Sequence, residues 1–500
     1  MASDNQAENQ NVHRGTILGV IIAGAIAALL NQTLLNTALP KLMDQFHITT
    51  STAQWVITIY MLVNGVLIPT TAFLMEKFTT RQLFLTSMCL FSVGTLICGI
   101  APYFAFMLVG RVIQASGAGI VMPLMTNVIF NMFPREKRGS AMGVVGIAMV
   151  FAPAIGPTLS GWVVEHYSWR LLFFIVLPIA VIVLIVSSFV LKNVTETKNP
   201  RLDVWGVILS TIGFGGLLYG FSTAGSKGWG SVEVIIMLLV GVICLVSFVM
   251  RQLRIDHAML EFRIFKTPAY TLAILISLLV NMTLYSGMIL LPVYVQDILH
   301  FSPVQSGLLM LPGSIIMGIM SPITGRLFDR FGARYLALTG LVITIVTTFG
   351  FTKLSLSTSY SYLLTLYTVR MLGLSMLMMP VMTSGLNSLP LRLNPHGTAM
   401  SNTINAIGGA LGTSLFVTIM STKSAAHTVD IINQHAINPA DQAQLAVAKM
   451  QGVAMGTSDA FMLATAFAII AFVLAFFLGT NPRGREGNKV REKGGAMQPS

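Results

Sequence analysis

The sequence predicts an all-α polytopic membrane protein, and its composition supports this fold class in three ways. Of its 500 residues, 54% are hydrophobic and only 10% are charged, and the mean hydropathy is +0.77. Soluble domains carry about a quarter charged residues. Apolar runs of about 20 residues recur along the chain, and each is long enough to cross a ~30 Å hydrocarbon core as a helix. The chain is therefore expected to lie largely in a lipid bilayer.

Fourteen such runs are expected to form transmembrane helices, with short polar segments between them. The first run follows a polar stretch of fifteen residues and is too long for a cleavable signal peptide, so it is expected to be retained. The fourteen ranges are 16–40, 52–75, 82–101, 104–133, 140–164, 169–191, 204–223, 232–250, 269–295, 304–325, 335–354, 360–388, 399–421 and 459–480.

The basic residues predict the orientation of these helices. An even number of spans places both termini on one side, and the loops and tails of that side hold 22 of the 30 Lys and Arg residues. The loops of the opposite side hold five. Because basic residues gather in cytoplasmic loops, both termini are expected in the cytoplasm and the chain in the cell membrane. The net charge of +12 is spread over these short loops, so we expect no nucleic-acid partner.

Two loops on the expected cytoplasmic side have similar sequences. "AFLMEKFTTR" (72–81) aligns without gaps on "GRLFDRFGAR" (325–334), so that an acid, a base, a phenylalanine and an arginine coincide. Such a repeat predicts two similar helical bundles that rock about a central site. The loops are expected to close a cytoplasmic gate through helix ends and arginines, although the charge order of a cytoplasmic loop can also be incidental. The expected gate residues are Glu76, Lys77, Arg81, Gly325, Asp329, Arg330 and Arg334.

The second loop resembles the signature G-x-L-x-D-R-x-G-x-R of the major facilitator superfamily. "GRVIQASGAG" (110–119) resembles the fourth-helix motif of that superfamily, and "GIAMVFAPAIGPTLSG" (146–161) its fifth-helix antiporter motif. The chain as a whole resembles the fourteen-span drug:proton antiporters of the lincomycin-resistance type. The resemblance implies a major facilitator fold of two six-helix bundles plus two extra helices. The expected regions are a cytoplasmic tail 1–15, a bundle 16–191, a linker region 192–268 with the extra helices, a bundle 269–480 with an external loop 422–458, and a basic tail 481–500.

The fifth expected helix is rich in glycine and proline. Small residues let helices approach closely, and prolines remove backbone hydrogen bonds and bend a helix. This composition suits a bundle that must seal and reopen, although both residues are generally frequent in transmembrane helices. The residues concerned are Gly146, Pro153, Gly156, Pro157 and Gly161.

Two arginines, Arg111 and Arg370, are expected deep in the hydrocarbon, where a charge is costly and usually marks function. At 1.5 Å per residue, Arg111 lies roughly 10 Å from the outer side and Asn31 roughly 22 Å from the inner side, so their depths are similar. The resemblance implies that fourteen-span antiporters commonly have an aspartate at the position of Asn31, whereas the lincomycin-resistance type shares the asparagine. An amide can form hydrogen bonds but cannot titrate, so the usual proton carrier is absent here. The arginines therefore either favour an anionic or zwitterionic substrate, or are satisfied by carbonyls and amides such as Gln114 and Asn31.

No carboxylate is expected deep in the bilayer, because all 18 acids fall in termini, loops or the last turn of a span. The proton carrier is therefore expected near a helix end. No Walker A sequence and no metal-spaced His/Cys cluster occurs, so we expect no cofactor and an ion gradient as the energy source. The candidate proton carriers are Glu165 beside His166, Asp297 and Asp459 on the outer side, and the gate acids Glu76 and Asp329 on the inner side.

Polar and aromatic residues within the spans predict a polar-lined cavity, because such groups turn away from lipid. Each of them can equally serve as a contact between helices. The expected substrate and proton pathway consists of Asn31, Gln32, Trp55, Tyr60, Asn64, Arg111, Gln114, Asn281, Tyr285, Arg370, Asn402 and Asn405.

The function expected from these features is secondary transport rather than enzymatic catalysis. The chain is expected to export lipophilic drugs or antibiotics by proton antiport with alternating access, as a monomer. One alternative is export of an endogenous amphipathic anion, such as a fatty acid, a lipid intermediate or a signalling nucleotide. A membrane enzyme acting on lipid would need a catalytic cluster at the interface, which the sequence does not show. A receptor that binds without transporting is a third alternative.

Overall fold

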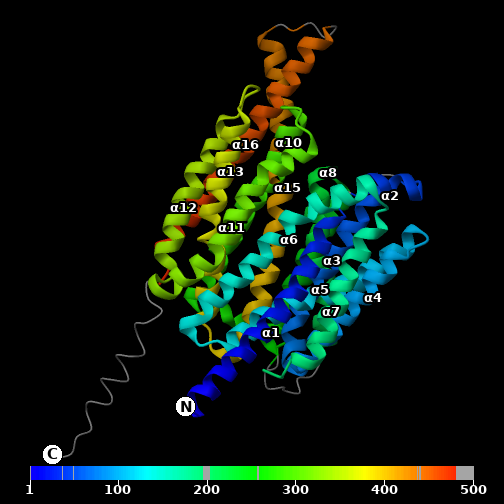
Figure 1. Ribbon diagram of the computed structural model, residues 1–500. Helices are drawn as coiled ribbons and strands as arrows, with labels where there is room; N and C mark the ends of the chain where they lie inside the picture. The colour runs from blue at the N-terminus through cyan, green and yellow to red at the C-terminus, as the bar shows by residue number, and fades with distance from the viewer. Residues whose placement is uncertain are drawn as a thin grey trace, which may run out of the picture.

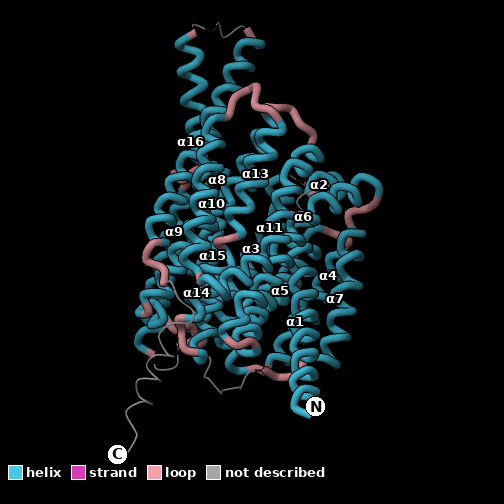
Figure 2. The backbone as a smooth tube through the Cα atoms, turned by 60° about the vertical axis from the view of Figure 1, so that its left-hand side comes forward, coloured by secondary structure: helices cyan, strands magenta, loops and turns pink. Residues whose placement is uncertain are grey.

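The computed structural model describes residues 2–35, 38–48, 50–194, 203–255, 258–435, 437 and 441–479. Throughout this part of the chain every regular element is an α-helix or a short 3₁₀-helix, as the tube in Figure 2 shows. The predicted all-α fold class is therefore confirmed. The basic tail 481–500 and the loop segment 195–202 lie outside the described residues.

The helices fall into three consecutive groups along the chain. The N-terminal half contains α1 (Ala2–Leu34), α2 (Leu39–Phe46), α3 (Thr50–Lys77), α4 (Thr80–Gly99), α5 (Phe104–Met132), α6 (Arg138–His166) and α7 (Arg170–Val190). The intervening pair is α8 (Val204–Lys227) and α9 (Val232–Arg254). The C-terminal half contains α10 (Pro268–Asp297), α11 (Pro303–Phe331), α12 (Ala333–Gly350), α13 (Tyr360–Ser375), α14 (Met378–Asn387), α15 (Asn394–Gln434) and α16 (Gln442–Ala475). Short 3₁₀ turns are η1 (Arg135–Lys137), η2 (Phe262–Lys266), η3 (Phe351–Lys353) and η4 (Leu391–Leu393).

Twelve segments of the described chain are long and apolar enough to cross a membrane, and α3 makes a thirteenth if its two bent parts form one span. The two parts of α3 meet at 56°, between Leu67 and Thr70, where the sequence has Pro69. The remaining expected span, 140–164, lies within α6 (Arg138–His166). The structure is therefore compatible with fourteen spans, and the count itself stays a prediction.

Proline also explains why the expected span 360–388 is divided into α13 and α14. Pro380 cannot donate a hydrogen bond to the carbonyl of Met376, four residues earlier, and its ring crowds that carbonyl. The α13 helix accordingly ends at Ser375, and α14 begins at Met378. The break places the first turn of α14 beside the cavity described below.

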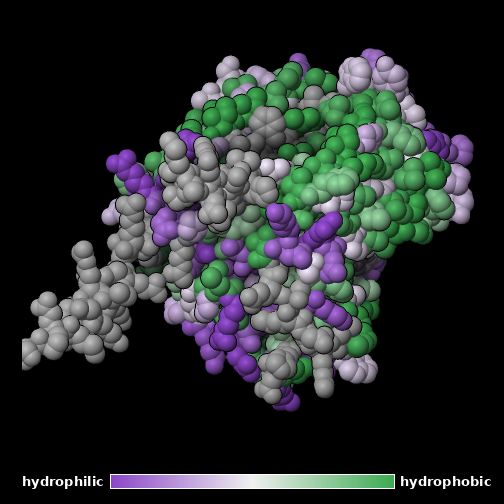
Figure 3. Space-filling view, turned by 60° about the horizontal axis from the view of Figure 1, so that its bottom comes forward, coloured by the Kyte–Doolittle hydropathy of each residue, from purple (hydrophilic) through white to green (hydrophobic). Residues whose placement is uncertain are grey.

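The two ends of the molecule differ in shape (Figure 1). We call the end at which α1 begins and α16 ends the termini face. The opposite end, where α15 and α16 project beyond the other helices, is called the hairpin face. Viewed from the termini face, hydrophilic side chains gather on this end, whereas hydrophobic side chains cover the flank at the upper right (Figure 3).

The projecting hairpin corrects one prediction. Residues 422–458 were expected to form an external loop, but α15 continues to Gln434 and α16 begins at Gln442, so most of this segment is helical. The sequence here is rich in alanine and glutamine, which are strong helix formers, and its low hydropathy does not oppose helix formation outside lipid. Asp441 caps the start of α16 by accepting hydrogen bonds from the backbone N–H groups of Ala443 and Gln444.

The helices pack around two hydrophobic cores. One core joins the N-terminal half to residues of α9, α10, α14 and the start of α15, and the other lies within the C-terminal half. The α8–α9 pair lies against both halves: Leu218 of α8 packs on Gly65 of α3, and the Trp229 indole N–H donates to Thr418 Oγ1 of α15 over 2.8 Å. By contrast, α9 leaves Val232 72% and Ile243 62% exposed, as expected of a lipid-facing helix.

A small polar network fixes the start of α8 at the termini face. Asp203 accepts a hydrogen bond from the Gly206 N–H, and its carboxylate also binds Arg251 and Gln252 of α9. Partial burial raises the pKa of Asp203, but the hydrogen bonds from Arg251, Gly206 and Gln252 outweigh burial, and the pKa lies below its ordinary value. The carboxylate therefore stays ionised and holds the two helices together at this end.

Candidate functional site

Arg111 is completely buried where α1, α3 and α5 meet. Its Nη1 donates to Asn31 Oδ1 over 2.5 Å and to Gln114 Oε1 over 2.8 Å, and its Nε donates to the Val56 carbonyl over 3.1 Å. The guanidinium also lies over the Tyr60 ring, 4.1 Å from the ring centroid. All of these partners are neutral, so the charge is stabilised by dipoles and a π face rather than by an acid.

The surrounding residues hold this arrangement in place. Gln114 donates from Nε2 to Thr95 Oγ1 over 2.7 Å, which orients its oxygen toward the arginine. Gly94 of α4 allows α5 to approach, because a Cβ there would lie 2.6 Å from the Gln114 Cα. Tyr60 in turn donates its hydroxyl to the Ala28 carbonyl of α1. The sequence placed Asn31 and Arg111 at similar depth, and the structure brings them into contact.

Arg370 occupies a comparable position in the C-terminal half. It is completely buried on α13, its Nε donates to Thr348 Oγ1 over 3.1 Å, and its Nη2 donates to Ser286 Oγ and to the Thr283 carbonyl. Gly287 is required beside it, because a Cβ there would collide with Nη1. Each half therefore contains one buried arginine held by neutral oxygens, as the second interpretation of the sequence proposed. One nitrogen of each guanidinium, Arg111 Nη2 and Arg370 Nη1, has no partner among the described residues.

Replacing Arg111 by methionine, a neutral side chain of similar length, is expected to destabilise the protein. Asn31 and Gln114 would lose the donor that their buried oxygens accept from, and hydrogen bonds to charged groups contribute about 1.5–3 kcal/mol each. Thermal unfolding in detergent micelles measures the change. The matched control is Arg392→Met, because Arg392 is exposed on η4. Equal stability of the two variants would show that these hydrogen bonds do not support the fold.

A cavity of about 160 Å³ lies where α6 of the N-terminal half meets α10, α14 and α15 of the C-terminal half. Asn281 donates from Nδ2 to Asn405 Oδ1 over 3.0 Å and to the Ser277 carbonyl, whereas the Nδ2 of Asn402 has no partner among the described residues. None of the described residues that line this cavity is charged. Its lining consists of Met149, Ser277, Val280, Asn281, Leu377, Met378, Met379, Val381, Met382, Asn402 and Asn405.

The cavity brings together three of the residues expected in the pathway, Asn281, Asn402 and Asn405. Sequence reasoning missed the four methionines, which supply a flexible and polarisable wall. The run Met376-Leu377-Met378-Met379, directly before Pro380, could have identified three wall residues.

Other residues of the expected pathway lie apart from both the arginines and this cavity. Trp55 stacks on Tyr219 of α8 with ring centroids 5.7 Å apart. Asn64 lies against Gly119, and Tyr285 packs on Gly409 of α15. Gln32 lies one residue beyond Asn31 on α1 and is partly exposed. The structure therefore divides the expected pathway into two arginine sites, one cavity and several helix contacts.

At the termini face the two halves are joined by Asp329 at the end of α11. Its carboxylate accepts hydrogen bonds from the Gly139 N–H over 3.0 Å, the Ser140 N–H over 2.9 Å and the Ser140 hydroxyl over 2.6 Å. These N–H groups begin α6 and have no partner within that helix, so the acid of one half caps a helix of the other. Arg138 makes a second contact between the halves, donating from Nη1 to Asn387 Oδ1 of α14 over 2.8 Å.

Below these hydrogen bonds, α6 and α11 pack through small residues. A Cβ on Gly143 would lie 2.6 Å from the Ser321 carbonyl oxygen and 2.8 Å from Pro322 Cα, and one on Gly325 would collide with the Gly139 carbonyl. The two backbones therefore touch, which only glycine permits. We call this contact of Gly139, Gly143, Gly146, Ser321, Pro322 and Gly325 the glycine seam.

The remaining expected gate residues do not form a single cluster. Arg81 donates to the Ser188 carbonyl of α7 over 2.5 Å. Lys77 lies over the Phe78 ring at 5.8 Å, and Arg330 lies over the Phe331 ring at 5.2 Å, so the two loop copies repeat one cation–π contact. Arg334 lies at the start of α12, partly exposed.

Comparison with known proteins places this architecture in a family. Residues 21–413 match the Major Facilitator Superfamily. The chain belongs to this superfamily. It is 43% identical over 464 residues to the lincomycin resistance protein LmrB of Bacillus subtilis strain 168, covering 92% of this chain and 95% of the relative. The uncharacterized MFS-type transporter YhcA of the same organism is 47% identical over 506 residues, covering 96% of this chain and 94% of the relative.

Solved structures of the superfamily have the same fold. The crystal structure of the human organic anion transporter MFSD10 has a TM-score of 0.61 at 13% sequence identity, covering 91% of this chain and 99% of that one. At this identity the likeness concerns the fold alone. The family match and the similarity to LmrB show that the chain is a membrane transporter and not an enzyme.

In this superfamily member the expected antiporter residues of α6 differ in what they pack against. Gly146 lies in the glycine seam, and Gly156 packs on Thr33 of α1. A Cβ on Gly161 would meet nothing within 4 Å, so this glycine is not required by packing. The side chains of Pro153 and Pro157 lie outside the described part of the structure.

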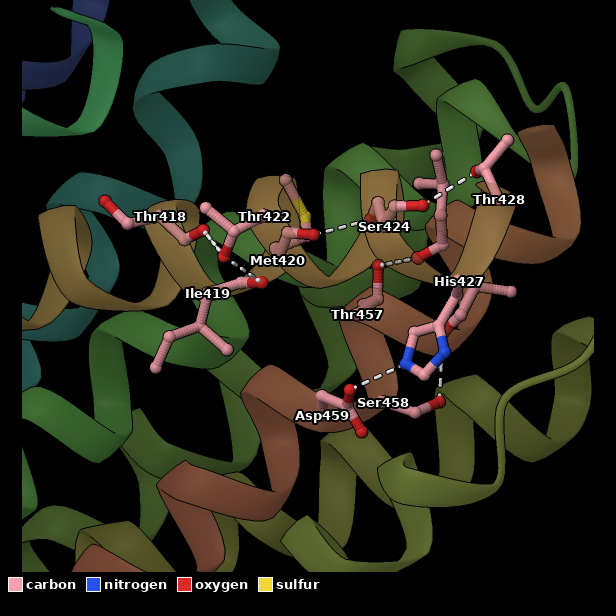
Figure 4. A network of polar contacts seen from close by, with 12 residues as sticks. Thr418, Ile419, Met420, Thr422, Ser424, His427, Thr428, Thr457, Ser458 and Asp459 are labelled. Carbon is pink, nitrogen blue, oxygen red and sulfur yellow. Dashed lines mark hydrogen bonds and ion pairs between the residues drawn. The ribbon is translucent and has the colours of Figure 1, made fainter. Parts of the chain in front are cut away.

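The outer candidate proton carriers of this transporter all lie toward the hairpin face. Glu165 and His166 are exposed at the end of α6, and Asp297 is exposed at the end of α10. Asp459 of α16 points toward His427 of α15, with Oδ2 and Nε2 2.8 Å apart (Figure 4). None of the described contacts of Arg111 and Arg370 involves a carboxylate. No group of three or more metal-ligating side chains occurs among the described residues.

Proposed function

We propose that this transporter exports lipophilic drugs or antibiotics by proton antiport with alternating access. The observation that carries the proposal is the cavity between the two halves, whose described lining includes four methionines and three asparagines and no charged residue. Thioethers adapt to apolar molecules of varied shape, and the amides can bind their polar groups. A relative that is 43% identical is named a lincomycin resistance protein, which supports an antibiotic substrate.

Alternating access is supported by the contacts at the termini face. With the contacts of Asp329, Arg138 and the glycine seam in place, the two halves are joined at the termini face. Export then requires that these contacts break so that substrate can enter, and re-form so that substrate can leave at the hairpin face. In this proposal the termini face is cytoplasmic, as the distribution of basic residues predicts.

Proton coupling needs a group that gains and loses a proton during the cycle. Because none of the described contacts of either buried arginine involves an acid, the carrier belongs near a helix end. Asp459 with His427, Glu165 with His166, and Asp297 are the outer candidates, and Glu76 and Asp329 the inner ones. The transporter is proposed to work as a monomer in the cell membrane, without a cofactor.

One observation favours a second candidate, export of an amphipathic anion. A buried guanidinium nitrogen without a partner, as in Arg111 and Arg370, would gain from an anionic oxygen. Both arginines are completely buried and neither lines the cavity, so a substrate would reach them only after the halves move. The first proposal therefore fits the geometry better.

Reconstituted transport distinguishes the two candidates. Purified protein in proteoliposomes is given a pH gradient, acidic inside, and the uptake of lincomycin, the cation ethidium and an anionic dye such as carboxyfluorescein is followed. Uptake of lincomycin or ethidium that stops when an ionophore collapses the gradient is the expected result. Gradient-dependent uptake of the anion alone would support the second candidate. Uptake that does not depend on the pH gradient would contradict proton antiport but not the proposal that the protein transports drugs.

A further inference from the structure

His396, in the first turn of α15, joins three parts of the chain at the termini face. Its Nε2 lies 3.5 Å from Glu76 Oε1 at the end of α3, and its Nδ1 lies 3.4 Å from the backbone nitrogen of Glu261, directly before η2. The His396 side chain is 7% exposed, and the Glu76 side chain is also largely covered. The N-terminal half, the C-terminal half and the segment between them therefore meet at one histidine.

This contact makes the two copies of the repeated loop chemically different. Asp329 of the second copy binds the backbone N–H groups and the hydroxyl of α6, and these donors do not titrate near neutral pH. Glu76 of the first copy faces an imidazole at the start of α15. Histidine is the side chain whose charge ordinarily changes between about pH 5 and 8. Among the described contacts, the carboxylate of the first copy alone therefore faces a titratable side chain.

The contacts of the ring assign its neutral tautomer. Nδ1 can accept from the Glu261 N–H only through its lone pair, so the single proton of the neutral ring lies on Nε2, toward Glu76. A second proton would have to occupy Nδ1. It would turn the Glu76 contact into an ion pair and would place two N–H groups against each other on the Glu261 side.

Comparing these two changes shows whether protonation of His396 strengthens or weakens the contacts at the termini face. Both contacts of the ring are long for hydrogen bonds, because N–H donors ordinarily lie about 2.7–3.2 Å from their acceptor, whereas Glu261 N lies 3.4 Å from Nδ1 and Glu76 Oε1 lies 3.5 Å from Nε2. At such separations the attraction between two opposite charges is stronger than the repulsion between a charged ring and a neutral N–H dipole. Protonation therefore strengthens the bridge between Glu76 and His396 by more than it weakens the contact with the segment before η2.

The other charged groups of the surrounding elements do not reverse this direction. The Glu261 carboxylate accepts from the Arg263 N–H and lies 3.7 Å from the Arg263 guanidinium. Lys77 of α3 lies over the rings of Phe73 and Phe78, and Tyr270 of α10 donates its hydroxyl to the Gly397 carbonyl. The remaining basic residues on the adjoining 3₁₀ turns are Lys266 of η2 and Arg392 of η4.

We propose that the Glu76–His396 pair is a proton-sensitive latch, which holds the termini face closed when that side of the membrane becomes acidic. The inference rests on the proposed alternating access, because a latch acts only on a face that opens. Such a latch would let acid conditions on that side slow the exporter. A transporter that brings in protons with each cycle would slow when the compartment receiving those protons acidifies.

The test measures how far the termini face is open as a function of pH. Spin labels are placed at the exposed positions Lys137 and Leu391, one in each half, in a background without the three native cysteines. Their distance distribution is recorded between pH 6 and 8 in nanodiscs, with and without lincomycin. In the otherwise unchanged protein the ratio of closed to open molecules is expected to rise about tenfold toward pH 6. In His396→Gln, which retains an N–H donor but cannot titrate, the ratio is expected not to change with pH.

His435→Gln is the matched control, because His435 is exposed on the projecting hairpin, and it is expected to keep the full response to pH. Glu76→Gln removes the charge of the partner and serves as a second variant if His396→Gln does not fold. An equal pH response of the His396→Gln and unchanged proteins would overturn the latch while leaving alternating access standing. A single distance distribution under all conditions would overturn both.

Discussion

Asp329→Asn is expected to reduce transport roughly ten- to hundredfold without preventing membrane insertion. The carboxylate accepts three hydrogen bonds from the start of α6, two of them from backbone N–H groups that have no other partner within the helix. An amide keeps the shape but replaces one accepting oxygen by a donor, which would face the Ser140 N–H. Because hydrogen bonds to charged groups contribute about 1.5–3 kcal/mol, the closed termini face becomes less stable by a similar amount.

The matched control is Asp297→Asn, because the Asp297 carboxylate is exposed at the end of α10. Surface expression, proteoliposome uptake of lincomycin and the distance between labels at Lys137 and Leu391 are measured for both variants. Asp329→Asn is expected to insert normally and to favour the open termini face. If Asp329→Asn transports at the unchanged rate and closes normally, the carboxylate is not part of the gate. A loss of uptake in Asp297→Asn with normal closure would instead identify a coupling residue.

The sequence could predict the depth of residues but not which helix faces meet. The rise of 1.5 Å per residue placed Asn31 and Arg111 at similar depth, and they are in contact. The same arithmetic says nothing about the rotation of each helix about its axis. Trp55 was expected in the pathway but stacks on Tyr219, because the added α8 packs against α3.

The residues that sequence reasoning missed belong to contacts between distant segments. His396 meets Glu76 across 320 positions of the chain, and Met149 meets the first turn of α14 only because α6 crosses the interface between the halves. No local pattern marks such residues, since each alone looks like an ordinary helix residue. The charged loop repeat was visible because both copies keep their order along the chain, whereas the different partners of Glu76 and Asp329 depend on the folded arrangement.

Gly143→Ala is expected to produce a defect of similar size from the addition of one methyl group. The new Cβ would lie 2.6 Å from the Ser321 carbonyl oxygen and 2.8 Å from Pro322 Cα, distances that real side chains do not adopt. Both contacts are with the backbone of α11, so no rotamer change can relieve them and the two helices must separate. Overpacking of this kind costs about 1–3 kcal/mol, and Gly143→Val, with a larger side chain, is expected to abolish transport.

In Gly143→Ala the stability of α6 and the closure of the termini face are expected to change in opposite directions, which distinguishes a gate defect from misfolding. Alanine is a better helix former than glycine by about 1 kcal/mol, so Gly143→Ala should make α6 itself more stable while it opens the termini face. Gly307→Ala on α11 is the matched control, because its Cβ would meet nothing within 4 Å. Labels at Lys137 and Leu391 are expected to move apart in Gly143→Ala and to stay in place in Gly307→Ala. Normal closure and uptake in Gly143→Ala would mean that α6 and α11 do not need backbone contact to seal this end, and the glycine seam would lose its role in the cycle.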